Sequence, residues 1–285
     1  MNTYSQKRNT LPMLTAFVAV FTGGAMASMK KSYRERIVRE DSAQGVCPER
    51  VLAESDIAPL PDPVRRWIAR SGAVGKPVPC SMRMRFKARM WRAPDAKPFA
   101  LEAWQTSFLR EPVRLFYMEA RMLGLPVRGL HVYDRGRASM DVRLAGIVPV
   151  ARASGDTMDV SETVTFLNDI VLFAPFLLPD PRLRWTEIDA RTVDVHLSMG
   201  GRSVSARVFF DDSGDVADFR SEDRSELQPD GSMKRLPWST PVVGYREIDG
   251  RRVPAGARTI YHRPEGPFTY GEFELVDVGY DPSRI

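Results

Sequence analysis

Apolar and polar residues alternate in a series of short segments from Cys80 to Tyr280, and the alternation is interrupted once, at residues 161–174. A period of two places successive side chains on opposite faces of a strand, so the series predicts an antiparallel sheet. In the interrupting stretch apolar residues recur at helical spacing until Pro175. We therefore expect a mainly β (α+β) fold, a curved antiparallel sheet or half-open barrel covered by one apolar helix.

A shorter helix is expected just before the sheet. Asp62 followed by Pro63 is typical of a first helical turn, and Gly72 is typical of a stop. Between them Trp67 and Ile68 lie on one apolar side. This short N-terminal helix would add a second cover to the sheet, with Trp67 as a buried anchor.

The segment 81–91 alternates without a fault. Its apolar face carries Met82, Met84, Phe86, Ala88 and Met90, and its other face carries Arg83, Arg85, Lys87 and Arg89, which we call the basic stripe. Four cations in a row could contact anionic head groups or an acidic ligand. Alternatively, the stripe lies on a solvated outer face and pairs with acids on neighbouring strands, which is the commoner arrangement.

Further strands follow at close intervals. We expect them at residues 99–109, 113–122, 130–133, 138–150, 193–197, 204–210, 216–222, 242–248, 252–262 and 268–278. The Asp249-Gly250 pair predicts a tight hairpin. In the apolar helix, Asp159 with Glu162 three residues later is a capping pattern, so we expect the helix to begin near residue 161.

The N-terminus differs in character from the rest of the chain. Lys7 and Arg8 precede an apolar segment at residues 11–29, close to the about 20 residues that cross a bilayer. The Ala25-Met26-Ala27 triplet fits a signal peptidase site, whereas the cations from Lys30 onward resist export. The segment is therefore either a cleaved signal peptide or a retained membrane anchor.

We divide the chain into residues 1–29, a signal peptide or membrane anchor, residues 30–54, a linker or helical stem, and residues 55–285, a single β-rich domain. The formal net charge is +5, and most of the surplus lies within residues 1–41. A nucleic-acid binder carries its excess charge on the folded domain, so we expect no nucleic-acid partner and a membrane contact through the N-terminal segment. This places the domain at the cell envelope, anchored or exported to the periplasmic or extracytoplasmic side.

The chain has two cysteines, Cys47 and Cys80. In an oxidising compartment they could form one disulfide between the linker and the first strand, and in a reducing compartment they would be two inert thiols. Of these alternatives we expect the unpaired thiols.

Several spaced motifs resemble a known bacterial family. They are Leu60-Pro61-Asp62-Pro63-Val64-Arg65-Arg66-Trp67, Pro237-Trp238-Ser239-Thr240-Pro241 followed by Tyr245-Arg246 and Asp249-Gly250, and an ending with Phe268, Tyr270 and Phe273. The family carries a domain of unknown function, often behind an N-terminal apolar segment, and the resemblance covers about residues 55–280. It implies no activity, ligand or catalytic residue. In fold alone, the layout is also similar to half-open barrels that carry lipoproteins and glycolipids across bacterial envelopes.

Motifs for catalysis and metal binding are missing from the sequence. It has no Gly-x-Ser-x-Gly, no His-Glu-x-x-His, no zinc-spaced cysteine pair and no glycine-rich phosphate loop. We expect no metal and no cofactor. Asp194 and His196 share a strand face and could orient an imidazole in a hydrolase-like enzyme. Glu272 and Glu274 could likewise form a carboxylate pair, although alternating acids are common on solvated faces.

We interpret the chain as a non-enzymatic envelope protein that binds or carries an apolar or amphipathic ligand such as a lipid. The candidate lining residues are Met82, Met84, Phe86, Phe173, Phe176 and Trp238, and the basic stripe is the candidate for contact with an anionic surface. Two alternatives stay open, a hydrolase-like enzyme built on His196 and Asp194, and a structural or interaction domain with a filled core. A cavity on the order of several hundred cubic ångströms between sheet and helix would favour the first interpretation over the filled core.

Overall fold

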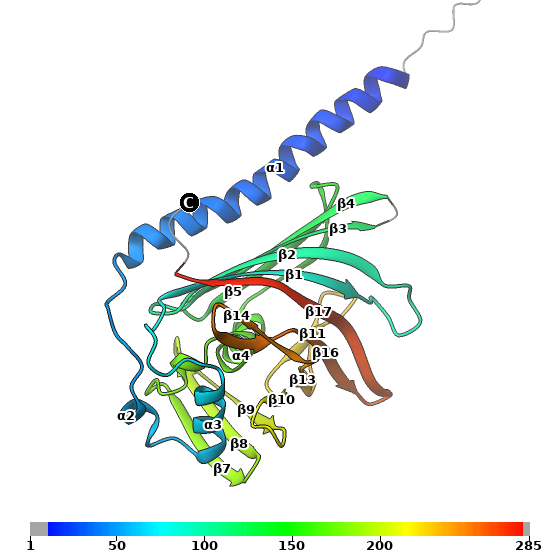
Figure 1. Cartoon of the computed structure of the whole chain (residues 1–285). Coiled ribbons are helices and arrows are strands. Elements are labelled where there is room, and N and C mark those ends of the chain that lie inside the picture. Colours follow the sequence, from blue (N-terminus) through cyan, green and yellow to red (C-terminus); the bar gives the residue numbers. More distant parts are fainter. Residues whose placement is uncertain (1–10, 123, 282–285) are drawn as a thin grey trace, which may run out of the picture.

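One long antiparallel sheet of 13 strands forms most of the computed structural model, which describes residues 11–122 and 124–281, with side chains from Ser28 onward. The sheet is curved, and we call the space on its concave side the hollow (Figure 1). The strand order is β6-β5-β4-β3-β2-β1-β17-β16-β13-β10-β9-β8-β7. The strands are β1 Ser81–Met90, β2 Phe99–Phe108, β3 Val113–Met122, β4 Leu125–Asp134, β5 Arg137–Leu144, β6 Val148–Ser154, β7 Leu183–Asp189, β8 Thr192–Met199, β9 Arg202–Phe210, β10 Val216–Ser221, β13 Trp238–Ser239, β16 Gly256–Arg263 and β17 Gly266–Tyr280. The expected fold class is confirmed.

Two small ribbons accompany the main sheet. They pair β11 (Ser225–Leu227) with β12 (Met233–Arg235), and β14 (Tyr245–Ile248) with β15 (Arg251–Pro254). The second ribbon contains the predicted Asp249-Gly250 hairpin. Two predicted strands, at residues 252–262 and 138–150, are wrong. The first is divided between β15 and β16, which belong to different sheets. In the second, β5 ends at Leu144 and β6 begins at Val148. The Ala145-Gly146 turn between them has positive φ at both residues, which ends the extended run.

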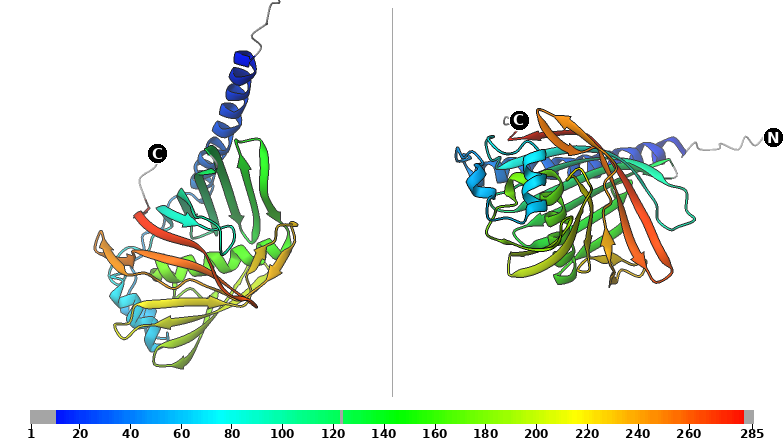
Figure 2. Two further views of the ribbon diagram at one scale, coloured as in Figure 1. Left: turned by 90° about the vertical axis from the view of Figure 1, so that its right-hand side faces the viewer. Right: turned by 60° about the horizontal axis from the view of Figure 1, so that its bottom comes forward.

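Helix α4 (Asp156–Phe173) runs through the hollow and connects the two edge strands, β6 and β7 (Figure 2). Buried residues lie on all sides of this helix rather than on one stripe. The predicted apolar helix is confirmed, but it begins at Asp156 and not near residue 161. Asp159 is not its cap. This side chain is buried and accepts hydrogen bonds from the Ala138 backbone nitrogen and from Arg202, each at 2.6 Å.

At one end of the hollow the two halves of the sheet touch. The β4–β5 turn meets the β8–β9 turn, and a Cβ atom added to Gly136 would lie 2.9 Å from the Cα atom of Gly200. Both glycines have positive φ, 92° and 59°. Such a close approach of two backbones requires residues without side chains. This end is therefore closed, and the opposite end, where β1–β2, β3–β4 and β5–β6 connect, is the mouth.

Two short helices, α2 (Glu54–Ile57) and α3 (Asp62–Arg70), precede the sheet. The predicted N-terminal helix is α3, and Pro175–Leu177 forms a 3-10 turn against it after α4. The Trp67 side chain is fully buried, and its indole nitrogen donates a hydrogen bond of 2.9 Å to the Val171 carbonyl oxygen of α4. The prediction that Trp67 is a buried anchor is confirmed, and its hydrogen bond fixes α3 to α4.

The end of helix α1 (Leu11–Gln44) packs on the outer face of the sheet, over β3 and β4. Tyr33 and Ile37 are buried there, and the Tyr33 ring stacks on Tyr117 with centroids 5.6 Å apart. The Tyr33 hydroxyl also shares a 3.0 Å hydrogen bond with Thr106. Much of the segment expected to be a linker or helical stem is therefore helix docked on the sheet.

Among the residues whose side chains are described, no helix is both long and apolar enough to cross a membrane. The expected signal peptide or anchor, residues 1–29, lies outside those residues except for Ser28 and Met29.

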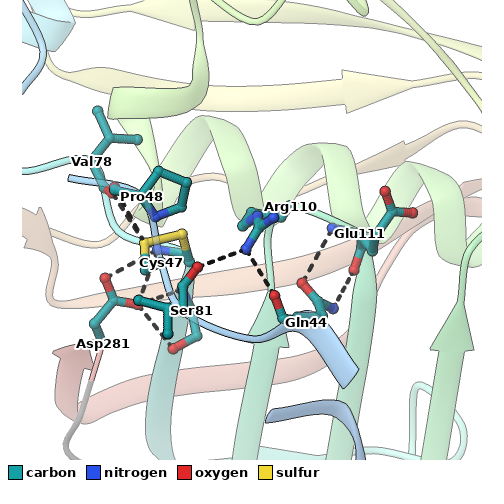
Figure 3. Close-up of a disulfide and its surroundings, with 10 residues drawn as sticks. Gln44, Cys47, Pro48, Val78, Ser81, Arg110, Glu111 and Asp281 are labelled. Carbon is teal, nitrogen blue, oxygen red and sulfur yellow. Dashed lines mark hydrogen bonds between the residues drawn. A yellow bond between two sulfur atoms is a disulfide. The ribbon is translucent and has the colours of Figure 1, made fainter. Parts of the chain in front are cut away.

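A disulfide links Cys47, just after α1, to Cys80, just before β1 (Figure 3). The expectation of unpaired thiols is therefore wrong. The chain between α1 and β1 folds back so that the two Cα atoms are 5.7 Å apart, a proximity that a sequence separation of 33 residues does not reveal. Arg110 supports the same corner by donating hydrogen bonds to the carbonyl oxygens of Gln44 and Val46 at 2.8 and 3.0 Å.

Candidate functional site

A cavity of about 440 Å³ lies between the concave face of the sheet and α4. Six methionines line it, namely Met90, Met118, Met122, Met140, Met158 and Met233, together with the aromatic residues Phe99, Phe116, Phe268 and Phe273. Gly129 of β4 makes room for Met118, because a Cβ atom at this position would lie 2.4 Å from the Met118 methyl carbon. This part of the wall is therefore apolar and consists largely of flexible side chains.

Three of the six predicted lining residues reach the cavity. Phe86, Phe173 and Trp238 line it. Trp238 is nearly fully buried, and its indole nitrogen donates a 3.0 Å hydrogen bond to the Tyr270 hydroxyl. The alternation of β1 thus identified the inward face correctly.

The other three predicted residues are not among those that line the cavity. Met82 and Met84 lie on the same face of β1, at the end away from Met90, and are buried in the solid core. Phe176 is buried against Tyr280, with ring centroids 5.6 Å apart, and Arg251 lies over its ring at 5.4 Å. This packing places Phe176 in the core rather than among the residues that line the cavity, so a charge at this position would test the core and not a ligand contact.

A buried ionic cluster lies in the cavity wall. Arg114 of β3 donates from Nε to Asp169 at 2.8 Å and from Nη1 to Glu162 at 3.2 Å, and both acids belong to α4. Gln105 of β2 donates a further hydrogen bond of 2.7 Å to Asp169. The cluster therefore ties the sheet to the helix, in surroundings where an unpaired charge would be costly.

Arg224, which follows β10, approaches Glu162 from the other side. Its Nη2 atom lies 3.7 Å from Glu162 Oε1, and its guanidinium carbon lies 4.6 Å above the ring of Trp238. It also donates to the Ser161 carbonyl oxygen at 3.0 Å and to the Tyr261 hydroxyl at 3.2 Å. One glutamate is thus flanked by two guanidinium groups.

The two acids of the cluster respond differently to burial. Burial raises the pKa of Asp169 in spite of Arg114 and Gln105. Burial also opposes ionisation of Glu162, but Arg224 and Arg114 outweigh it and hold the pKa of this carboxyl below its usual range. Burial lowers the pKa of the neighbouring His131 to about 4, so this imidazole is neutral at pH 7.

The sequence carried a signal for this cluster that the strand patterns did not reveal. Glu162 and Asp169 are spaced seven residues apart on the predicted helix, which places both on one side. Arg114 lies two residues before Phe116 on β3, so the two side chains share the inward face. Every residue from Val113 to Tyr117 is buried, because α1 covers the outer face and α4 the inner face, so alternation does not mark the inward side.

The basic stripe lies on the outer face of β1, as its alternation predicted. Arg89 forms an ion pair of 2.5 Å with Glu272 of β17, and Lys87 lies between Glu102 and Glu274 in the strand register. Glu272 and Glu274 thus face cations and not one another. None of the four stripe residues lines the cavity, and contact with an anionic surface remains a prediction.

The residues of the hydrolase alternative are not assembled for catalysis. Both carboxylate oxygens of Asp194 accept hydrogen bonds from Arg207, at 2.7 and 2.9 Å, while His196 is exposed on β8. A Ser239–His262 hydrogen bond of 2.8 Å exists elsewhere, and neither residue lines the cavity. Among the described residues, no group of three or more His, Cys, Asp or Glu side chains is arranged to hold a metal ion.

The mouth of the cavity has an exposed apolar rim. We use this name for Leu125, Ile147, Val148 and Val150, which are 48%, 50%, 55% and 39% exposed. The register of β4, β5 and β6 brings these residues to neighbouring strand ends, and Val150 itself lines the cavity. Arg143 and Arg152 lie on the same strands.

Comparisons with known proteins identify a family and a few structures of similar layout. The model of a family of unknown function, DUF6544, matches residues 50–273, in agreement with the resemblance seen in the sequence. No curated protein matches the chain. A domain assigned as an outer membrane lipoprotein-sorting protein from Vibrio parahaemolyticus has a TM-score of 0.43 and 9% identity, covering 72% of this chain and 87% of that chain.

Two further structures are similar to a comparable degree. A DUF1329 family protein from Desulfovibrio piger has a TM-score of 0.45 and 11% identity, covering 83% of this chain and 96% of that chain. A LolA superfamily protein from Nitrosomonas europaea has a TM-score of 0.43 and 13% identity, covering 82% of this chain and 96% of that chain.

Proposed function

The chain belongs to the family of unknown function DUF6544, and from its own residues we propose that it binds an apolar or amphipathic molecule such as a lipid. The observation that carries this proposal is the cavity of about 440 Å³ between the sheet and α4. Natural small-molecule sites span roughly 300–1,000 Å³ and combine apolar walls with a few polar groups. The methionine wall and the ionic cluster match that description.

The cavity also supports this proposal over a structural domain with a filled core. Protein interiors leave few voids larger than a water molecule, because each lost contact costs free energy. Methionine side chains adapt to ligands of different shape, which suits a site that holds flexible chains. No specific observation favours the enzyme built on His196 and Asp194.

The experiment is direct binding of an apolar fluorescent probe. We expect the uncharged dye N-phenyl-1-naphthylamine to bind the full chain with a micromolar or lower Kd, about −8 kcal/mol. Ala120→Trp should block binding, since Ala120 lines the cavity. Ala100→Trp is the matched control, because Ala100 is exposed on the neighbouring strand and does not line the cavity. Absence of probe binding by the unmodified chain would leave the filled-core alternative standing.

We further propose that the domain resides at the cell envelope. The Cys47–Cys80 disulfide supports an oxidising compartment, and the basic leader and apolar segment of residues 1–29 support export or anchoring. Alkaline phosphatase fused after Ile285 should be active, because that enzyme folds only where disulfides form. An inactive phosphatase beside an active cytoplasmic reporter fused at the same site would contradict this location.

A further inference from the structure

Two arginines face the cavity with one carboxylate between them. Arg114 Nη1 lies 3.2 Å from Glu162 Oε2, and Arg224 Nη2 lies 3.7 Å from Glu162 Oε1, so each oxygen faces a different guanidinium. The three side chains come from β3, from the segment after β10 and from α4. All three line the cavity.

Neither guanidinium is fully used by the protein. Arg114 Nε binds Asp169 and Nη1 binds Glu162, and among the described residues no partner faces its Nη2 atom. The Nη2 atom is also not fully buried, so it remains accessible. Among the residues that the structure describes, the Nη2 atom of Arg224 has only the long 3.7 Å contact with Glu162. Each arginine therefore keeps one N–H group for a ligand.

The two arginines of the cluster can attract an incoming anion. Arg114 and Arg224 supply two positive charges, which Glu162 and Asp169 oppose. Asp169 competes with such an anion for Arg114, because its Oδ2 atom accepts a hydrogen bond from Arg114 Nε. The N–H groups that the protein leaves free would still attract an anion, since charge–charge interactions are strong in buried surroundings.

We propose that the ligand carries an acid head group, a carboxylate or a phosphate, bound by Arg114 and Arg224, while its apolar chain lies along the methionine wall. The inference rests on the proposed function and specifies its ligand class. Guanidinium groups suit this role, since their N–H groups match the oxygens of carboxylates and phosphates. His131, with its ring 5.7 Å from that of Phe116, lies beside the cluster and offers one neutral donor.

The experiment compares ligands that share a chain and differ in the head group. The assay measures how well each of three compounds displaces the uncharged dye N-phenyl-1-naphthylamine from the full chain. The compounds are dodecanoic acid, dodecyl phosphate and dodecanol. We expect both acids to bind at least about tenfold more tightly than the alcohol, and the stronger of the two distinguishes a carboxylate site from a phosphate site. Equal affinity of acids and alcohol would overturn the head-group inference and leave the proposed function intact. Failure of the dye and all three compounds to bind would overturn the proposed function itself.

A variant that removes one negative charge of the cluster gives a second test, in which neither arginine is replaced. Replacing Arg114 would leave Asp169 and Glu162 buried without a cation, and that variant risks unfolding. Asp169→Asn keeps the side-chain shape and removes the competing carboxylate. It should tighten binding of dodecanoic acid several-fold and leave dodecanol unchanged. Asp212→Asn, at an exposed turn, is the matched control. An unchanged preference for acid over alcohol in Asp169→Asn would contradict the inference.

Discussion

Asp218 is a carboxylate in an unfavourable position. It lies on β10, and its Oδ1 atom is buried without a hydrogen-bond partner. Burial raises the pKa of Asp218 to about 6, and the nearby Arg220 opposes this effect only in part. Since the ordinary pKa of aspartate is about 3.9, the folded state binds more protons than the unfolded state between these two values.

From this we predict how stability changes with pH. Because the folded state holds the extra proton, the contribution of Asp218 to the free energy of unfolding should fall as pH rises from about 4 to above 6. Asp218→Asn should therefore raise the urea midpoint at pH 7.5 and have little effect at pH 4. Asp95→Asn, at an exposed position in the β1–β2 loop, is the control and should change neither midpoint. A lower midpoint for Asp218→Asn at pH 7.5 would show that the carboxylate is stabilised in the fold.

At the residue scale, sequence patterns located the inward face of β1 but only part of the cavity. Phe86, Phe173 and Trp238 line the cavity because each continues an apolar pattern into the hollow, and their contact with a ligand stays a prediction. Arg114 was not predicted, because a charged residue in a strand is ordinarily assigned to the solvated side. Only the contacts with α4 show that its charge is satisfied inside.

At the scale of elements, the closed end of the hollow depends on two glycines. We predict that Gly136→Ala and Gly200→Ala each destabilise the fold by several kcal/mol, since a Cβ atom would lie 2.9 or 2.8 Å from a backbone Cα atom that cannot move aside. Gly201→Ala is a matched control. It has a positive φ of 73° but nothing within 4 Å of the added atom, so it should cost only the backbone strain, about 1 kcal/mol. Urea unfolding of the three variants measures the difference, and equal losses would mean that the two turns do not touch.

The disulfide should stabilise the fold by restricting the unfolded chain between Cys47 and Cys80. With a sequence separation of 33 residues between the cysteines, loop closure in the unfolded state predicts a contribution of about 3–4 kcal/mol. The Cys47→Ser, Cys80→Ser double variant should lose that amount, and dithiothreitol should lower the stability of the natural chain to the same level. The double variant serves as the control for reductant, which should leave it unchanged. Insensitivity of the natural chain to reductant would mean that the thiols are not paired in solution.

The sequence predicted most elements because their patterns are local. β3 has the predicted bounds, and α3 lies where Asp62, Pro63 and Gly72 indicated. Errors arose where distant segments decide the outcome. The start of α4 was misplaced because Asp159 resembles a cap, whereas Ala138 and Arg202 bind it. The cysteine pairing depends on the path of the whole segment between α1 and β1.

At the scale of the whole molecule, the mouth of the cavity and the N-terminal end of α1 lie at the same end of the sheet. Figure 1 shows the N-terminal end of α1 extending past the sheet on the side where β3 joins β4, and the left view of Figure 2 agrees. That junction belongs to the mouth, beside the exposed apolar rim. If residues 1–29 reach a membrane, as we propose, the mouth of the cavity therefore lies toward that membrane.

This arrangement predicts that the exposed apolar rim takes part in ligand transfer. Ile147→Asp should slow transfer of a fluorescent fatty acid from phosphatidylglycerol vesicles to the full chain several-fold, since a charge at the rim opposes contact with an anionic bilayer. The affinity for a soluble probe should stay unchanged, because Ile147 does not line the cavity. Ile188→Asp is the matched control, since Ile188 is 48% exposed and lies on β7 at the far edge of the sheet. Equal transfer rates for the two variants would exclude the rim from membrane contact, and a ligand would then have to reach the cavity through the aqueous phase.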